Sequence, residues 1–75
     1  MPVKLFALTT DTESKLAIEM LKEAEMEYDL IQPDNSLMGY QVMFSVTGTR
    51  KVPVLSVNGK AYRGLEGVRQ FLGTR

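Results

Sequence analysis

The segment Gly48–Lys60, GTRKVPVLSVNGK, decides the fold of this chain. Within it the pair Asn58-Gly59 stands between two β-rich runs, Val54–Val57 and Lys60–Arg63, and both turn residues tolerate the positive φ of a type I′ turn. Pro53 cannot donate a hydrogen bond to a sheet ladder, so it belongs at the start of a strand or on an edge. The segment therefore predicts a loop followed by a tight β-hairpin.

Length and composition limit the class of protein to which this chain can belong. The 75 residues are 44% hydrophobic, enough for one packed core, and we expect a single monomeric domain over residues 1–75. Nine basic and nine acidic residues cancel, which argues against a nucleic-acid partner because phosphate binding needs a basic surplus. No apolar run is long enough to span a membrane, and the first residues lack the apolar stretch of a signal peptide. We therefore expect a cytoplasmic protein.

The chain contains no cysteine and no histidine. Disulfides, thiol chemistry, Cys/His zinc sites and histidine acid–base catalysis are therefore excluded within it. Carboxylates, hydroxyls, amines and backbone groups remain for chemistry, and we expect no metal site.

The first half of the chain has a strand–helix–strand pattern. The apolar run Val3–Leu8 predicts a strand that is buried on both faces. Glu27–Ile31 predicts a short second strand. Between them, Ser14–Glu25 predicts a helix. Its expected buried stripe consists of Ala17, Met20, Leu21 and Ala24, widened by Leu16 and Ile18. Two caps fit its start equally well, namely a capping box from Thr10 to Glu13 and an N-cap at Asp11.

Two further helices are predicted. The first covers Ser36–Val46 and ends at Gly48, with Leu37, Tyr40, Met43 and Phe44 as its apolar positions. The second follows the hairpin over Gly64–Leu72 and places Leu65, Val68, Phe71 and Leu72 at helical spacing. The complete order is βαβ, then α, then ββα.

This order resembles the glutaredoxin branch of the thioredoxin superfamily, and it is also similar to the N-terminal domain of glutathione transferases. The residues that carry the resemblance are Val3–Phe6, Leu21-Lys22-Glu23 with Glu27-Tyr28, Lys51-Val52-Pro53-Val54-Leu55 and Arg63-Gly64-Leu65-Glu66. The resemblance implies an α/β, thioredoxin-like fold, in which a four-stranded mixed sheet has helices on both faces. It also implies a cis peptide bond between Val52 and Pro53.

The chemistry of the resembled family depends on a Cys-x-x-Cys tetrad, which maps onto Asp11-Thr12-Glu13-Ser14. Asp11 takes the place of the nucleophilic cysteine and Ser14 that of the resolving one. Thiol–disulfide oxidoreductase activity is therefore excluded, and we expect no catalytic residue in the tetrad. Asp11 is instead expected to be an ionised helix cap, and we hypothesise that it pairs with Lys51 in a loop that also carries Arg50.

The resemblance implies six candidate residues for binding a peptide or glutathione-like ligand. They are Lys51, Val52, Pro53, Gly64, Leu65 and Glu66. Two further glutathione contacts of the family are lost, because Leu8 replaces its lysine and Glu13 its tyrosine, and Lys51 replaces the threonine that precedes Val-Pro in the family. What remains in the set is largely backbone.

Several functions fit these observations. The first is a redox-inactive binding module that needs no cofactor and holds a peptide, a protein partner or a glutathione-like ligand at the cis-proline cleft. A second is a transferase-like enzyme in which a hydroxyl of Thr9, Thr10, Thr12 or Ser14 activates the thiol of glutathione. A third is a redox-related protein without intrinsic thiol–disulfide activity. A plain alternative is a domain whose former site is only a capped helix end.

Overall fold

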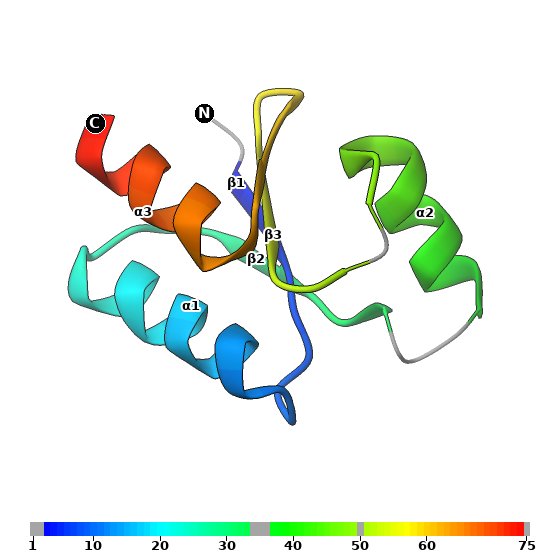
Figure 1. Ribbon diagram of the computed structural model, residues 1–75, viewed down its shortest axis with the longest axis horizontal. Coiled ribbons are helices and arrows are strands. Elements are labelled where there is room, and N and C mark those ends of the chain that lie inside the picture. The colour runs from blue at the N-terminus through cyan, green and yellow to red at the C-terminus, as the bar shows by residue number, and fades with distance from the viewer. Residues whose placement is uncertain (1–2, 34–36, 50, 75) are drawn as a thin grey trace.

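The helices and strands follow one another in the expected order. The computed structural model describes residues 3–33, 37–49 and 51–74 (Figure 1). Its elements are β1 (Val3–Phe6), α1 (Thr12–Glu23), β2 (Asp29–Ile31), α2 (Leu37–Thr47), β3 (Val54–Val57), β4 (Lys60–Arg63) and α3 (Gly64–Thr74). The predicted α/β order of βαβ, α and ββα is confirmed.

The strands form one mixed sheet in the order β2-β1-β3-β4. β1 runs parallel to β2 and antiparallel to β3, and β3 runs antiparallel to β4. β1 and β3 are therefore the central strands. Their side chains decide what each face of the sheet offers, because successive residues of a strand point to opposite faces.

Helices cover both faces of the sheet, as expected. α1 and α3 lie on one side and α2 lies on the other (Figure 1). The core under α1 and α3 consists of Val3, Leu5, Ala7, Ala17, Leu21, Leu55, Val57, Val68 and Phe71. The core under α2 is smaller and consists of Phe6, Met43 and Val54. The second face is thus the more thinly covered one.

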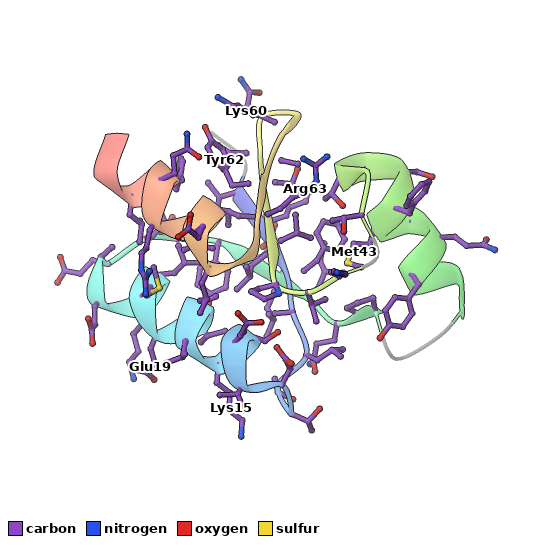
Figure 2. The ribbon with its side chains drawn as sticks, in the orientation of Figure 1. Lys15, Glu19, Met43, Lys60, Tyr62 and Arg63 are labelled. Carbon is purple, nitrogen blue, oxygen red and sulfur yellow. The ribbon has the colours of Figure 1, made fainter. Side chains whose placement is uncertain are left out.

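α1 begins two residues before the predicted start, because Asp11 is the N-cap. Leu16 does not widen the buried stripe, since its side chain is 50% exposed. Lys15 and Glu19 also point away from the sheet (Figure 2). Beyond the helix Glu25 has a left-handed φ of 55°, so the predicted extension to that residue is wrong.

The next two elements also differ from their predicted bounds. β2 is shorter than expected, since it begins at Asp29. α2 ends one residue later than predicted, at Thr47, where Gly48 takes a left-handed φ of 76°. The predicted start at Ser36 lies outside the described residues. Met43 points from α2 to the sheet (Figure 2) and is fully buried, whereas Phe44, another of the predicted apolar positions, is 45% exposed.

The hairpin matches its predicted bounds. Asn58 and Gly59 have φ values of 53° and 87°, as a type I′ turn requires. The peptide bond between Val52 and Pro53 is cis. The chain passes directly from β4 into α3, and Gly64 at this junction has a left-handed φ of 69°.

Candidate functional site

The tetrad at residues 11–14 forms the start of α1. The carboxylate of Asp11 accepts a hydrogen bond of 2.8 Å from the backbone N–H of Ser14. The hydroxyl of Ser14 accepts another, of 3.1 Å, from the backbone N–H of Leu8. Ser14 is fully buried, while Thr12 and Glu13 are exposed. The tetrad is therefore a capped helix end that is tied to the preceding loop.

Two of the four hydroxyls considered for an enzyme are engaged in the structure. Ser14 is buried and bonded to Leu8, and the hydroxyl of Thr9 donates to the side-chain oxygen of Gln32 at 3.2 Å. Thr10 and Thr12 remain exposed to solvent. Nothing in this geometry singles out one hydroxyl as an activating group.

The hypothesised pair between Asp11 and Lys51 is not formed. Within the described part of the chain, no oxygen of Asp11 lies within 4.0 Å of the Lys51 ammonium, and the Lys51 side chain is exposed. Arg50 lies outside the described residues. Among the described residues, the partner of the Asp11 carboxylate is the backbone N–H of Ser14 at the helix end.

The six predicted ligand contacts come from two segments that the fold brings together. The carbonyl of Pro53 accepts a hydrogen bond of 2.8 Å from the N–H of Gly64. Next to it, Val54 faces Arg63 in the β3–β4 ladder. Lys51–Pro53 and Gly64–Glu66 consequently lie side by side at the junction of β3, β4 and α3.

The six candidate residues differ in burial: some pack against the cores, and others have exposed side chains. Pro53 is buried and Val52 is half-buried, and Val52 packs on the small core of Phe6, Met43 and Val54. Leu65 packs against the larger core. The side chains of Lys51 and Glu66 are exposed. Apolar packing thus fixes the backbone of the two segments, while charged groups stand at the surface.

Backbone polar groups of these segments are open. No hydrogen bond to a described residue engages the N–H or the C=O of Val52. The N–H groups of Leu65 and Glu66 lie in the first turn of α3, where a helix provides no acceptor for them. Donors and one acceptor are therefore available on neighbouring segments.

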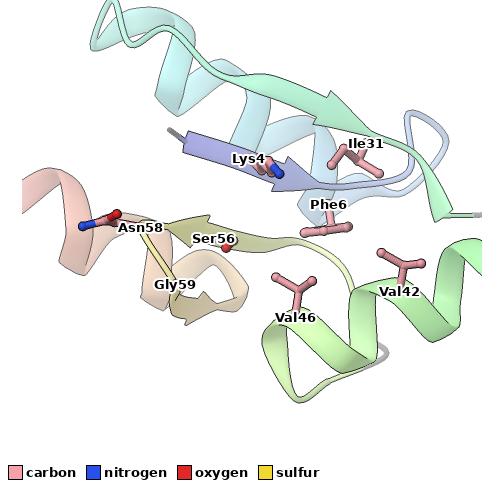
Figure 3. Close-up of a pocket in the computed structure, with 8 residues that line it drawn as sticks. All are labelled: Lys4, Phe6, Ile31, Val42, Val46, Ser56, Asn58 and Gly59. Carbon is pink, nitrogen blue, oxygen red and sulfur yellow. The ribbon is translucent and has the colours of Figure 1, made fainter. Parts of the chain in front are cut away.

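A pocket of about 320 Å³ lies elsewhere, between the sheet and α2 (Figure 3). Its lining residues are Lys4, Phe6, Ile31, Val42, Val46, Ser56, Asn58 and Gly59. None of them belongs to the predicted site. Sequence reasoning missed this pocket, although two signals were present: a lysine within the apolar first strand and an uncharged sequence in the second helix.

The described residues offer no group of three acidic side chains that could hold a metal ion. Among them, too, no helix has the length and apolar character needed to cross a membrane.

Comparison with known proteins gives structural relatives only. No family model and no curated protein matches the sequence. A glutaredoxin from Archaeoglobus fulgidus superposes on 97% of this chain with a TM-score of 0.82 and 23% identity, over 86% of its own length. This chain has the glutaredoxin-type thioredoxin fold.

Two plant glutaredoxins show the same relationship to this glutaredoxin-like chain. One, from Populus tremula x tremuloides in its holo form, has a TM-score of 0.78 and 21% identity over 97% of this chain and 68% of its own. The other, from buckwheat in complex with glutathione, has a TM-score of 0.77 and 22% identity over 92% of this chain and 66% of its own. The glutaredoxin-like chain thus spans about two thirds of each plant protein. It differs from the resembled pattern in having no cysteine.

Proposed function

We propose that this glutaredoxin-like chain is a redox-inactive binding module for a short, extended peptide with a free carboxylate, of which glutathione is the simplest candidate. The ligand lies along Val52 and reaches the first turn of α3. The observation that carries the proposal is the hydrogen bond between Pro53 and Gly64, which places two sets of open backbone groups next to each other.

The chemistry of each segment suits a different part of such a ligand. Val52 offers one N–H and one C=O, the pair that an extended peptide backbone engages when it adds to a strand edge. Leu65 and Glu66 offer N–H groups at a helix N-terminus, where the helix dipole favours a carboxylate. The exposed side chain of Lys51 adds a positive charge at the residue next to Val52.

The absence of cysteine separates binding from redox turnover. Neither a mixed disulfide nor an internal disulfide can form in a chain that has no sulfhydryl group. The capped turn at Asp11 and Ser14 offers no replacement nucleophile, because Ser14 is buried and its oxygen already accepts a hydrogen bond. The ligand is therefore bound and released without chemical change.

The test is a titration of the ¹⁵N-labelled chain with S-methylglutathione, followed by amide chemical shifts. This probe has the γ-glutamyl and glycine carboxylates of glutathione but cannot exchange thiols. We expect the largest shifts at Val52, Leu65 and Glu66. Shifts that are absent at millimolar probe would instead support a domain whose former site is only a capped helix end.

A charge-matched pair of variants checks the location. Lys51→Gln removes the ammonium beside Val52 and should weaken binding of S-methylglutathione about threefold, the size of an exposed ion pair. Lys22→Gln removes an equally exposed ammonium from the last turn of α1 and should leave binding unchanged. Equal effects of the two substitutions would contradict a specific site at Val52.

A further inference from the structure

We propose that the pocket between α2 and the sheet is a second binding site, specific for an amphipathic carboxylate with a medium-length hydrocarbon chain. None of the residues of the first site lines this pocket, so the two proposals are independent. The inference rests on a pocket that is apolar at one end and polar at the other (Figure 3).

The apolar end lies between two strands and α2. Phe6 of β1 and Ile31 of β2 come from the sheet, and Val42 and Val46 come from the facing helix (Figure 3). The two valines are 48% and 46% exposed, an unusual state for a pair of aliphatic side chains on one helix. A hydrocarbon chain placed here would remove this apolar surface from water, which is the main source of affinity in such pockets.

α2 has no charged side chain to oppose such a ligand. Its sequence, LMGYQVMFSVT, contains no acidic or basic residue. A helix that is apolar on most sides normally has partners on most sides. Among the α2 side chains that the structure describes, Met43 and Thr47 are buried, whereas those of residues 41, 42 and 44–46 are exposed.

The polar end is formed by Lys4 and Ser56, which face each other across the β1–β3 ladder and so lie on the same side of the sheet. Ser56 is only 6% exposed and lines the pocket, and its hydroxyl makes no hydrogen bond to any described residue. It is not a buried unsatisfied group, so the hydroxyl is open to the pocket. The hydroxyl of Ser56 and the ammonium of Lys4 can both donate to a carboxylate in the pocket.

The charges around Lys4 leave its ammonium available. Asp29 is its neighbour on the opposite side, across the β1–β2 ladder. Among the described residues, however, Asp29 has no oxygen within 4.0 Å of the Lys4 ammonium, and Asp29 does not line the pocket. Among the described residues, Lys4 is the one charged side chain in the lining, so the pocket favours an anion.

The volume sets the size of the ligand. At about 320 Å³ the pocket is near the small end of the range for small-molecule sites, which begins at about 300 Å³. It suits one short chain with a head group and is too small for the apolar face of a partner helix. A medium-chain fatty acid therefore fits better than a protein segment.

The experiment compares octanoate, octylamine and octanol, which share one chain and differ in the head group. Each is titrated into the ¹⁵N-labelled chain. We expect octanoate to shift the amides of Lys4, Phe6 and Ser56, octanol to shift them more weakly and octylamine to bind least. Equal binding of octanoate and octylamine, or no shift at the solubility limit, would overturn the proposal.

Two variants and one control locate the ligand. Val46→Glu puts a negative charge into the apolar end and should abolish octanoate binding, whereas Gln41→Glu puts the same charge on the exposed side of α2, outside the pocket lining, and should not. Lys4→Gln should weaken octanoate about threefold and leave octanol unchanged. Sedimentation of the free chain adds a further test, since a dimer that Val46→Glu dissociates would show that a second copy covers the pocket.

Discussion

The hydroxyl of Ser14 accepts a hydrogen bond of 3.1 Å from the backbone N–H of Leu8. This bond joins the loop after β1 to the first turn of α1. In the resembled Cys-x-x-Cys pattern, the position of Ser14 corresponds to the resolving cysteine. It gives Ser14 a structural role, because the oxygen satisfies a backbone donor that has no strand partner. The same turn is closed from the other side by the carboxylate of Asp11.

Ser14→Ala tests this role. The substitution leaves the part-buried N–H of Leu8 without an acceptor, so the free energy of unfolding should fall by about 1–3 kcal/mol. Urea denaturation followed by circular dichroism measures the change. The matched control is Ser45→Ala on the exposed side of α2, which should change stability by less than about 0.5 kcal/mol. Similar small changes in both variants would contradict a role for Ser14 in holding the loop.

The hairpin was predictable from sequence because its cause is local. Asn58 and Gly59 are among the few residues that accept a left-handed φ, and two of them together fix the turn and the register of both strands. For the start of α1 the sequence left two possible N-caps open, because Thr10 and Asp11 both have side chains that cap helices well. The hydrogen bond from the backbone N–H of Ser14 to the carboxylate of Asp11 identifies Asp11 as the cap in the structure.

The buried side of α2 was harder to predict. Met43 and Phe44 are adjacent and both apolar, so a helix that is apolar all round gives no periodic signal for which of them faces the core. The structure buries Met43 and exposes Phe44. The pocket beside α2 was missed for a related reason, because Lys4 and Ser56 meet only through the register of distant strands.

Two glycines of α3 should respond oppositely to alanine. A Cβ atom on Gly67 would lie 2.4 Å from the backbone carbon of Tyr62, so Gly67→Ala forces the helix away from β4 and should cost about 1–3 kcal/mol. A Cβ atom on Gly73 meets nothing within 4 Å, and Gly73→Ala should stabilise the helix by about 0.5 kcal/mol. Thermal unfolding of the two variants checks the sign. Equal shifts in melting temperature would mean that α3 does not pack closely on Tyr62.

Arg63 holds the end of α2 to the sheet. Its guanidinium donates a hydrogen bond of 3.1 Å to the carbonyl of Thr47, at the negative end of the helix dipole. Arg63→Gln should therefore lower the free energy of unfolding by about 0.5–1.5 kcal/mol. Arg69→Gln, at an exposed position of α3, is the control and should have little effect. If the control loses as much stability as Arg63→Gln, the contact with Thr47 contributes nothing.

The side chain of Glu66 should weaken binding of the ligand that its backbone N–H is proposed to hold. Its carboxylate lies in the first turn of α3, near the N–H groups proposed to receive a ligand carboxylate. Glu66→Gln removes this repulsion and should strengthen binding of S-methylglutathione about twofold, with the gain vanishing in high salt. Calorimetric titration at two salt concentrations measures both effects. Unchanged affinity would place the ligand carboxylate away from α3.

The central proposal is that this chain, which has a glutaredoxin fold without cysteine, binds its ligand through the backbone of Val52 and of the first turn of α3. Asp11→Cys places a thiol at the helix N-terminus, where the helix end stabilises the thiolate. The measurement is the rate at which this variant forms a mixed disulfide with oxidised glutathione, beside Lys22→Cys as an exposed control and the unaltered chain as a blank. The account predicts that Asp11→Cys reacts at least about tenfold faster than Lys22→Cys, through the lowered pKa of such a thiol and binding of the disulfide beside it, and that the unaltered chain does not react. Equal rates for the two cysteine variants would contradict it.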